Sequence, residues 1–162
     1  MSGNILRREC NWEALGLGYL ASYVKAHSDC EVDFFQGCFD QDFEIINGCR
    51  DADIVAFGCT TPTFPHAVRL AKGIKAVNPN VWTVVGGYHP SAVPNECKGI
   101  DQVVVGEGEE SMLKVVNGER SPTVFGRPMQ FSELPWPDRQ LIRNERNIQV
   151  AYSDNKLRIT SV

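Results

Sequence analysis

The chain has 162 residues, of which 43% are hydrophobic and 22% charged, the composition of a soluble globular protein with one domain and an appendage. No apolar run approaches the roughly 20 residues that span a bilayer, and the start lacks the apolar core of a signal peptide, so we expect a cytoplasmic protein with no membrane partner. The net charge of −4 divides into −6 for residues 1–118 (9 basic, 15 acidic) and +2 for residues 119–162 (7 basic, 5 acidic), and so acidic a body argues against nucleic-acid binding.

Short apolar runs alternate with amphipathic segments along the first 118 residues. The runs that predict strands are 4–6, Glu31–Phe35, Asp53–Cys59, Val81–Val85 and Gln102–Val105. The segments that predict helices are Leu15–Ala26, Phe39–Cys49, Phe64–Val77 and Glu109–Val116, with a broken segment around Pro90 and Pro94. Strands that alternate with helices indicate an α/β fold with a mostly parallel five-stranded sheet. Its first strand is nearly absent, because Arg7-Arg8-Glu9 follows Asn4-Ile5-Leu6 at once.

A different kind of sequence follows Gly118, where we expect the domain to end. Four prolines punctuate it, and its LPWPD stretch cannot lie inside a helix. Short strand-like runs at 150–152 and 158–162 come last. The chain stops within the second run, which we interpret as the mark of a piece cut from a longer protein.

Three predicted strands end in loops of small and polar residues. These loops are Gly58-Cys59-Thr60-Thr61-Pro62-Thr63, Gly86-Gly87-Tyr88-His89-Pro90 and Gly106-Glu107-Gly108-Glu109-Glu110. Glycine permits positive φ and a close approach of ligand to backbone, and threonine offers hydroxyls or caps the next helix. Because the carboxyl ends of parallel strands meet at one edge, the three loops predict a ligand site there.

Other chemistries find little support. Gly16-x-Gly18-x-x-Ala21 has the spacing of a dinucleotide fingerprint but no apolar strand in front of it. The six cysteines form no C-x-x-C or C-x-x-x-C pair, so we predict reduced thiols, several in the core, and no metal site. No nucleophile elbow or catalytic carboxylate pair is evident, so no catalytic residue is assigned. His27 and His66 are predicted on the surface, whereas His89 is predicted at the ligand loop.

Four segments together resemble a known family. They are LGLGYLASYVKAH, DIVAFGCTTPT, TVVGGYHPS and VVVGEGEESMLKVV, and in this order they look like the cobalamin (B12)-binding domain that precedes the core of B12-dependent radical S-adenosylmethionine (SAM) enzymes. LPWPDRQLI resembles the bridge in those enzymes, and the terminal RITSV resembles the first strand of their barrel. The resemblance implies a flavodoxin-like Rossmann three-layer sandwich over 1–118, then a linker and the start of a truncated radical SAM barrel over 119–162.

The same resemblance implies the ligand and its site. Thr60, Thr61, Pro62 and Thr63 would border the corrin ring; Gly86, Gly87, Tyr88, His89 and Pro90 would line the pocket for the nucleotide tail; and Gly106, Glu107, Gly108 and Glu109 would close its far side. On this basis we expect Gly87→Val to block the pocket and leave the fold intact. The motif Asp-x-His-x-x-Gly is absent from the sequence, so base-off cobalamin without a histidine ligand from that motif is expected.

The implied function is a cobalamin-binding module of a radical SAM methyltransferase-like enzyme. The 4Fe–4S cluster and SAM would belong to a downstream domain that this chain lacks, so the chain alone is not expected to be catalytic. Two alternatives stay open: a docking domain of the same fold that holds no corrinoid, and a flavodoxin-like protein that binds FMN or a phosphate compound at Thr60–Thr63.

Overall fold

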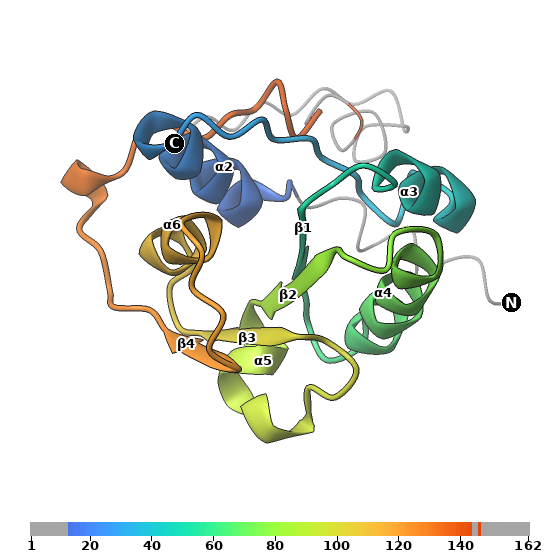
Figure 1. Ribbon diagram of the computed structural model, residues 1–162. Helices are drawn as coiled ribbons and strands as arrows, with labels where there is room; N and C mark the ends of the chain where they lie inside the picture. Colours follow the sequence, from blue (N-terminus) through green and yellow to red (C-terminus); the bar gives the residue numbers. More distant parts are fainter. Residues whose placement is uncertain (1–12, 144–145, 147–162) are drawn as a thin grey trace, which may run out of the picture.

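A parallel sheet with helices on both faces forms the centre of the computed structural model, which describes residues 13–143 and 146 (Figure 1). Its four strands are adjacent in chain order: β1 (Ile54–Gly58), β2 (Trp82–Gly86), β3 (Gln102–Val105) and β4 (Thr123–Phe125). The α-helices are α2 (Leu15–His27), α3 (Asp42–Gly48), α4 (Phe64–Val77), α5 (Tyr88–Ala92) and α6 (Glu109–Val116). Two 3-10 turns, η1 (Pro94–Glu96) and η2 (Phe131–Glu133), complete the described elements.

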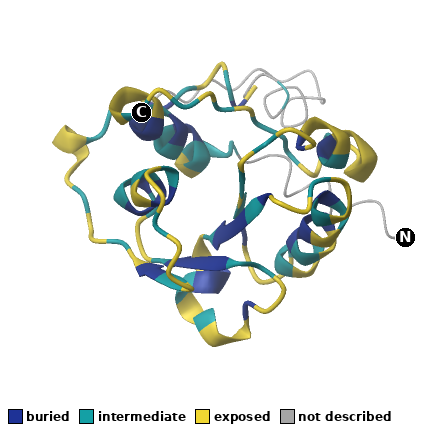
Figure 2. Cartoon of the chain, viewed as in Figure 1, coloured by how far each residue is buried: buried dark blue, intermediate teal, exposed yellow. Residues whose placement is uncertain are grey.

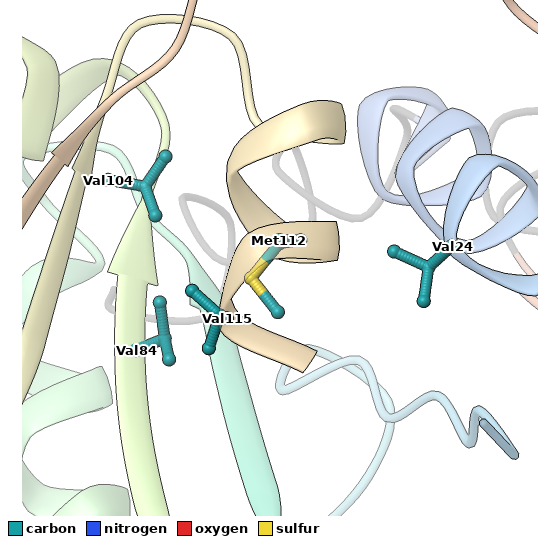
Figure 3. Packing of buried hydrophobic residues seen from close by; sticks show 5 residues of the cluster. All are labelled: Val24, Val84, Val104, Met112 and Val115. Atoms are coloured by element: carbon teal, nitrogen blue, oxygen red, sulfur yellow. The ribbon is translucent and has the colours of Figure 1, made fainter. Parts of the chain in front are cut away.

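Side chains alternate between the two faces of the sheet, as the pleat requires. Val84 and Val104 pack against Val24 of α2 and the Met112–Val115 side of α6, and Figure 3 shows Met112 between α2 and the strands. Val85 and Val103 point to the opposite face, toward Ala67 of α4. Figure 2 shows the central strands mostly buried and the outer faces of the helices exposed. These are the three layers of the predicted flavodoxin-like sandwich, so the fold class is confirmed.

The predicted strand at Glu31–Phe35 is wrong, because residues 31–36 form no strand. The Phe35 ring instead lies directly over Gly48 at the end of α3 and joins the cluster around Ile45 and Ile74. Phe35 is therefore half-buried against a helix, without a backbone ladder. The described sheet has four strands where five were predicted, and the strand predicted at 4–6 lies outside the described residues.

The fourth strand, β4, was not predicted. Pro122 comes directly before it and Pro128 three residues after its end, so the three residues with good strand propensity lie in a stretch that does not read as a strand. Pro122 lacks an N–H, but its carbonyl accepts a hydrogen bond from Val103 N at 2.9 Å, so it starts the ladder without breaking it. Because β4 lies at the sheet edge, its other side needs no partner.

The segment after β4 packs back onto α2. Gly18 is buried there, and a Cβ on it would lie 3.3 Å from Pro137 Cβ and 3.4 Å from Ile142 Cδ1. Asp138 N donates to the Gly18 carbonyl at 3.1 Å, and the Asp138 carboxylate pairs with Lys25 at 3.0 Å. The second glycine of the fingerprint spacing, Gly18, thus serves helix packing.

The division of the chain into two parts at Gly118 stays a prediction. Among the described helices, none is long and apolar enough to cross a membrane.

Candidate functional site

The three predicted loops meet at the carboxyl edge of the sheet. Gly58 and Gly86 are partners in the β1–β2 register, so the first two loops leave the sheet side by side. Cys59 N donates to the Gly86 carbonyl at 2.9 Å, and His89 N donates to the Cys59 carbonyl at 3.2 Å. Gly106 N in the third loop donates to Ser91 Oγ at 3.0 Å. Two backbone hydrogen bonds and one bond to the Ser91 side chain therefore hold the loops in a fixed relation to one another.

Hydroxyl groups organise the loop after β1. Thr63 Oγ1 accepts from Thr60 N at 2.9 Å, donates to the Thr60 carbonyl at 3.1 Å and lies 3.1 Å from Thr60 Oγ1. Thr63 precedes α4 but makes no side-chain cap to it. Thr60, Thr61 and Pro62 are exposed at the edge. The loop thus presents a rigid polar surface to solvent.

The loop after β2 divides into an exposed and a buried part. Gly87 and Tyr88 are exposed, and the Tyr88 side chain is 83% exposed. His89 and Pro90 are buried inside the short helix α5, with His89 7% exposed. His89 Nδ1 lies 3.2 Å from Thr61 Oγ1, and its ring packs at 4.5 Å from that of Phe64. His89 therefore packs behind the exposed loop after β1 and contacts it through Thr61 and Phe64.

Gly87 is fixed by the backbone. Its φ of 101° suits glycine, and a Cβ there would lie 2.8 Å from the Cys59 carbonyl oxygen. The expectation that Gly87→Val leaves the fold intact is therefore wrong, because the side chain would force the first two loops apart.

The loop after β3 adds carboxylates. Glu107 is exposed at the edge, whereas Glu109 begins α6 and is 8% exposed. Both glutamates line a cavity of about 310 Å³ on the α2 side of the edge. Its other lining residues are Gly16, Tyr19, Met129, Phe131 and Leu134. A neighbouring cavity of about 380 Å³ lies along the segment that ends at Trp136.

The contributions of α2 and of the proline-rich segment to this cavity were not predicted. The signal available was the set of aromatic residues in an otherwise polar stretch. Phe131 and Trp136 are both more than 80% exposed.

Bare backbone lies at the carboxyl ends of β1 and β2, on the face that α2 covers. Gly58 and Gly86 have no side chains, and Ala56 lies two residues before Gly58 on the same face. A Cβ on Gly86 would make only an ordinary contact, 3.6 Å from Val104 Cβ. Leu17 of α2 covers Gly58, since its Cδ2 would lie 3.2 Å from a Cβ on Gly58.

Cys59 lies in the first loop but is a poor nucleophile. Burial, with a smaller contribution from Cys97, raises the pKa of the Cys59 thiol to about 12. Cys49 and Cys97 are also buried, which fits the predicted core thiols. Within residues 13–143 and 146, no three His, Cys, Asp or Glu side chains are grouped to hold a metal ion.

A parallel α/β sandwich whose open edge carries glycines, hydroxyls and carboxylates defines a ligand-binding domain of the Rossmann-like class. The comparison with protein families is more specific. The model of the B12 binding domain matches residues 1–116, and the chain belongs to that family.

Two curated proteins are similar to this chain. An uncharacterized methyltransferase of Pyrococcus horikoshii is 37% identical over 109 residues, which are 64% of this chain and 24% of the relative. The anaerobic magnesium-protoporphyrin IX monomethyl ester cyclase of Rubrivivax gelatinosus is 36% identical over 115 residues, or 65% of this chain and 20% of the relative. The chain therefore spans a quarter or less of the length of these relatives.

A solved structure supports the fold. The N-terminal domain of a hypothetical protein from Thermotoga maritima aligns with a TM-score of 0.53 and 27% sequence identity. The alignment covers 68% of this chain and 88% of that domain.

Proposed function

We propose that this chain is a cobalamin-binding module that positions base-off cobalamin for methyl transfer in a radical SAM methyltransferase-like enzyme of the cytoplasm. The observation that carries the proposal is the carboxyl edge of a B12-binding-family sheet, where exposed glycines and threonines offer backbone and hydroxyls to a ligand. Cobalamin, when bound, supplies a cobalt centre that accepts and donates a methyl group. The protein supplies position and shielding.

The residues at the edge fit such a group. Thr60, Thr61 and Pro62 offer an exposed rim with two hydroxyls, and Gly87 and Gly106 are exposed at the same edge. The exposed Tyr88 side chain is available to cover an apolar part of the corrin ring. Glu107 can accept hydrogen bonds from the amide side chains of that ring. Thr63, His89 and Pro90 would support this surface without reaching its exposed side.

The nucleotide tail needs a second space, and the α2 side of the edge provides it. Gly58 lies under Leu17 and is the register partner of Gly86, and the cavity lined by Glu107 and Glu109 lies on the same side of the edge. A cavity of about 310 Å³ is at the lower end of the range for small-ligand sites. We infer that the tail enters beside α2 and displaces the Leu17 side chain.

The larger protein is part of the proposal. Because the relatives are at least four times longer than the aligned segment, a downstream radical SAM domain with its 4Fe–4S cluster and SAM would supply the methyl chemistry. That domain would be the protein partner, and the segment through Trp136 would lead toward it.

Hydroxocobalamin retention tests the proposal directly. Purified protein is mixed with the cofactor and desalted, and we expect about one equivalent of corrin absorbance to remain. Folded protein that retains no corrin would contradict the proposal and favour the docking domain. Retention of FMN in place of corrin would favour the flavodoxin-like alternative, for which Thr60–Thr63 offers the hydroxyls.

Leu17→Trp tests the path of the tail. The larger side chain would cover more of the backbone at Gly58, so we expect cobalamin affinity to fall about tenfold, the order expected for one displaced apolar contact. Cobinamide, a corrinoid without the nucleotide tail, is expected to bind as well as it does to the wild type. Leu15→Trp in the same helix is the control. Equal loss of both corrinoids would contradict a tail path under Leu17.

A further inference from the structure

The buried imidazole of His89 has one hydrogen-bonding atom with a partner and one without. Nδ1 lies 3.2 Å from Thr61 Oγ1, whereas Nε2 is buried and has no hydrogen-bond partner among the residues that the structure describes. The ring is fixed, because His89 N is bonded to the Cys59 carbonyl and the ring packs on Phe64. This histidine connects the loop after β1 to the loop after β2, directly beneath the exposed edge.

The two neutral tautomers have different consequences for these atoms. With the proton on Nε2, a buried N–H donor has no acceptor, and Nδ1 must accept the only proton of the Thr61 hydroxyl. With the proton on Nδ1, the ring donates to Thr61 Oγ1 and leaves Nε2 as a bare acceptor. Among buried backbone groups, N–H donors without partners are rarer than under-satisfied carbonyl acceptors, and we apply the same preference to the imidazole. The surroundings of Nε2 therefore favour the tautomer protonated on Nδ1.

This tautomer changes what Thr61 can do. If the Thr61 oxygen accepts from His89, its own proton is free to be donated elsewhere, and Thr61 is exposed at the edge. The other two hydroxyls of the loop are engaged with each other and with the Thr60 carbonyl. Thr61 is thus the threonine of this loop whose proton remains available to a ligand.

We infer that His89 is a positioning residue that holds Thr61 as a directed hydrogen-bond donor to the ligand at the carboxyl edge. The group it serves is a neutral acceptor such as an amide carbonyl, which the side chains of a corrin ring carry. The inference rests on the proposed function for the identity of the ligand. The tautomer itself does not depend on any ligand.

Nitrogen NMR of the ligand-free protein tests the tautomer. With ¹⁵N-labelled histidine, the ring nitrogens of His89 are assigned by their loss in His89→Asn. We expect Nδ1 to be protonated and Nε2 to be bare at neutral pH. A proton on Nε2 would overturn the inference, because the Thr61 hydroxyl would then donate its proton to Nδ1 of the ring.

A double-mutant cycle tests the positioning role. We expect Thr61→Val and His89→Phe each to weaken hydroxocobalamin binding roughly three- to tenfold, the effect of one hydrogen bond, and the double variant to bind no more weakly than Thr61→Val alone. His89→Asn, whose amide can still donate to Thr61, is expected to recover most of the affinity. Thermal unfolding of each variant separates a folding defect from a binding defect.

The outcomes distinguish this inference from the function on which it rests. Independent losses, so that the double variant loses the product of the two single effects, would overturn the positioning role while cobalamin binding stands. A folded His89→Asn variant that does not recover hydroxocobalamin affinity would also overturn the positioning role. No retention of hydroxocobalamin by the wild type would overturn the proposed function and the positioning role together, whatever the tautomer.

Discussion

Gly126→Ala is expected to lower the free energy of unfolding by about 3 kcal/mol, the upper part of the range for an overpacked site. Gly126 follows β4, and a Cβ there would overlap the backbone carbonyl oxygen of Glu107, with Glu107 C at 2.7 Å and Glu107 N at 2.9 Å. Backbone cannot swing aside as the end of a side chain can. Gly126 N also donates to the Val105 carbonyl at 2.8 Å, so separating the two segments would strain this bond. The melting temperature should fall by roughly 6–12 °C for a chain of this size.

Gly16→Ala is the matched control for this change. Gly16 lies in the first turn of α2, and a Cβ on it would meet nothing within 4 Å. Alanine favours the helix, so we expect no loss of stability and a gain of up to about 0.5 kcal/mol. Chemical denaturation of both variants provides the measurement. Equal stability of Gly126→Ala and wild type would contradict the close approach of the loops after β3 and β4.

The parts of the fold that sequence analysis located correctly are those with a local pattern. The amphipathic repeat of Phe64–Val77 and the acidic first turn of Glu109–Val116 mark the bounds of α4 and α6 as the structure has them. The apolar run Gln102–Val105 likewise coincides with β3. In each case the residues that decide the element lie within it.

The parts that were wrong depend on partners far away in the chain. Glu31–Phe35 has strand-like residues, but Phe35 packs half-buried over Gly48 and the segment has no ladder among the described residues. Thr123–Phe125 follows a proline, yet it becomes a strand because the edge of β3 is available to Val124. Neither outcome can be derived from local propensity, since strand formation needs a neighbour.

The candidate site shows the same division between features set by a local pattern and features set by partners far away in the chain. The three loops were found because glycines and hydroxyls follow apolar runs, and parallel strands bring such loops together. The reason for several glycines was different from the one expected. Gly87 and Gly106 have positive φ and face the backbone of Cys59 and Gly126, so the chain itself occupies the space that their missing side chains leave. Gly86 is the glycine whose open face is most consistent with a ligand.

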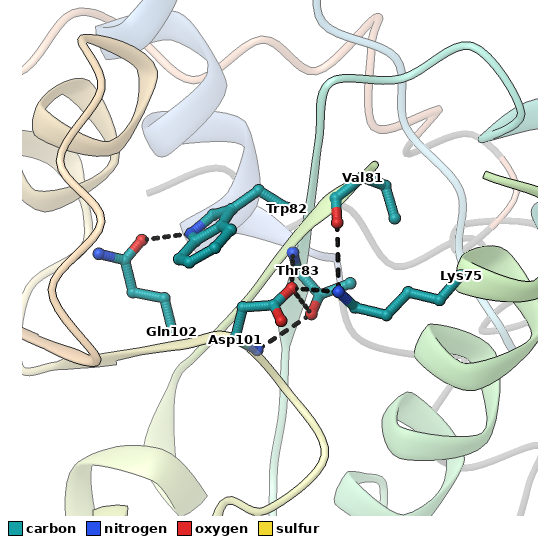
Figure 4. A network of polar contacts seen from close by, with 6 residues as sticks. All are labelled: Lys75, Val81, Trp82, Thr83, Asp101 and Gln102. Atoms are coloured by element: carbon teal, nitrogen blue, oxygen red, sulfur yellow. Dashed lines mark hydrogen bonds and ion pairs between the residues drawn. The ribbon is translucent and has the colours of Figure 1, made fainter. Parts of the chain in front are cut away.

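A buried polar network supports the end of the sheet opposite the site. Thr83 is fully buried in β2, and its N–H and hydroxyl both donate to Asp101 Oδ2, at 2.8 and 2.7 Å. Lys75 of α4 pairs with the same oxygen at 2.7 Å (Figure 4). Burial by itself raises the pKa of Asp101, but the hydrogen bonds from Lys75 and Thr83 together hold it below its usual value of 3.8. The carboxylate is therefore stabilised in its ionised form.

Asp101→Ala is expected to lower the free energy of unfolding by about 3 kcal/mol at pH 7, because two buried donors of Thr83 lose their acceptor. Asp101→Asn keeps one acceptor oxygen and should lose about half as much.

Because the folded pKa of Asp101 is depressed, the charge-dependent stabilisation is present in full above the unfolded pKa, near 3.8, and disappears as the pH falls through the lower folded value. The stability difference between wild type and Asp101→Asn should thus stay constant from pH 7 to about pH 5 and shrink below pH 4. Urea denaturation across this range measures it, with the exposed Asp51→Asn as a control expected to change stability by less than about 0.5 kcal/mol. A difference that persists unchanged below pH 3 would show that the Asp101 charge does not stabilise the folded sheet.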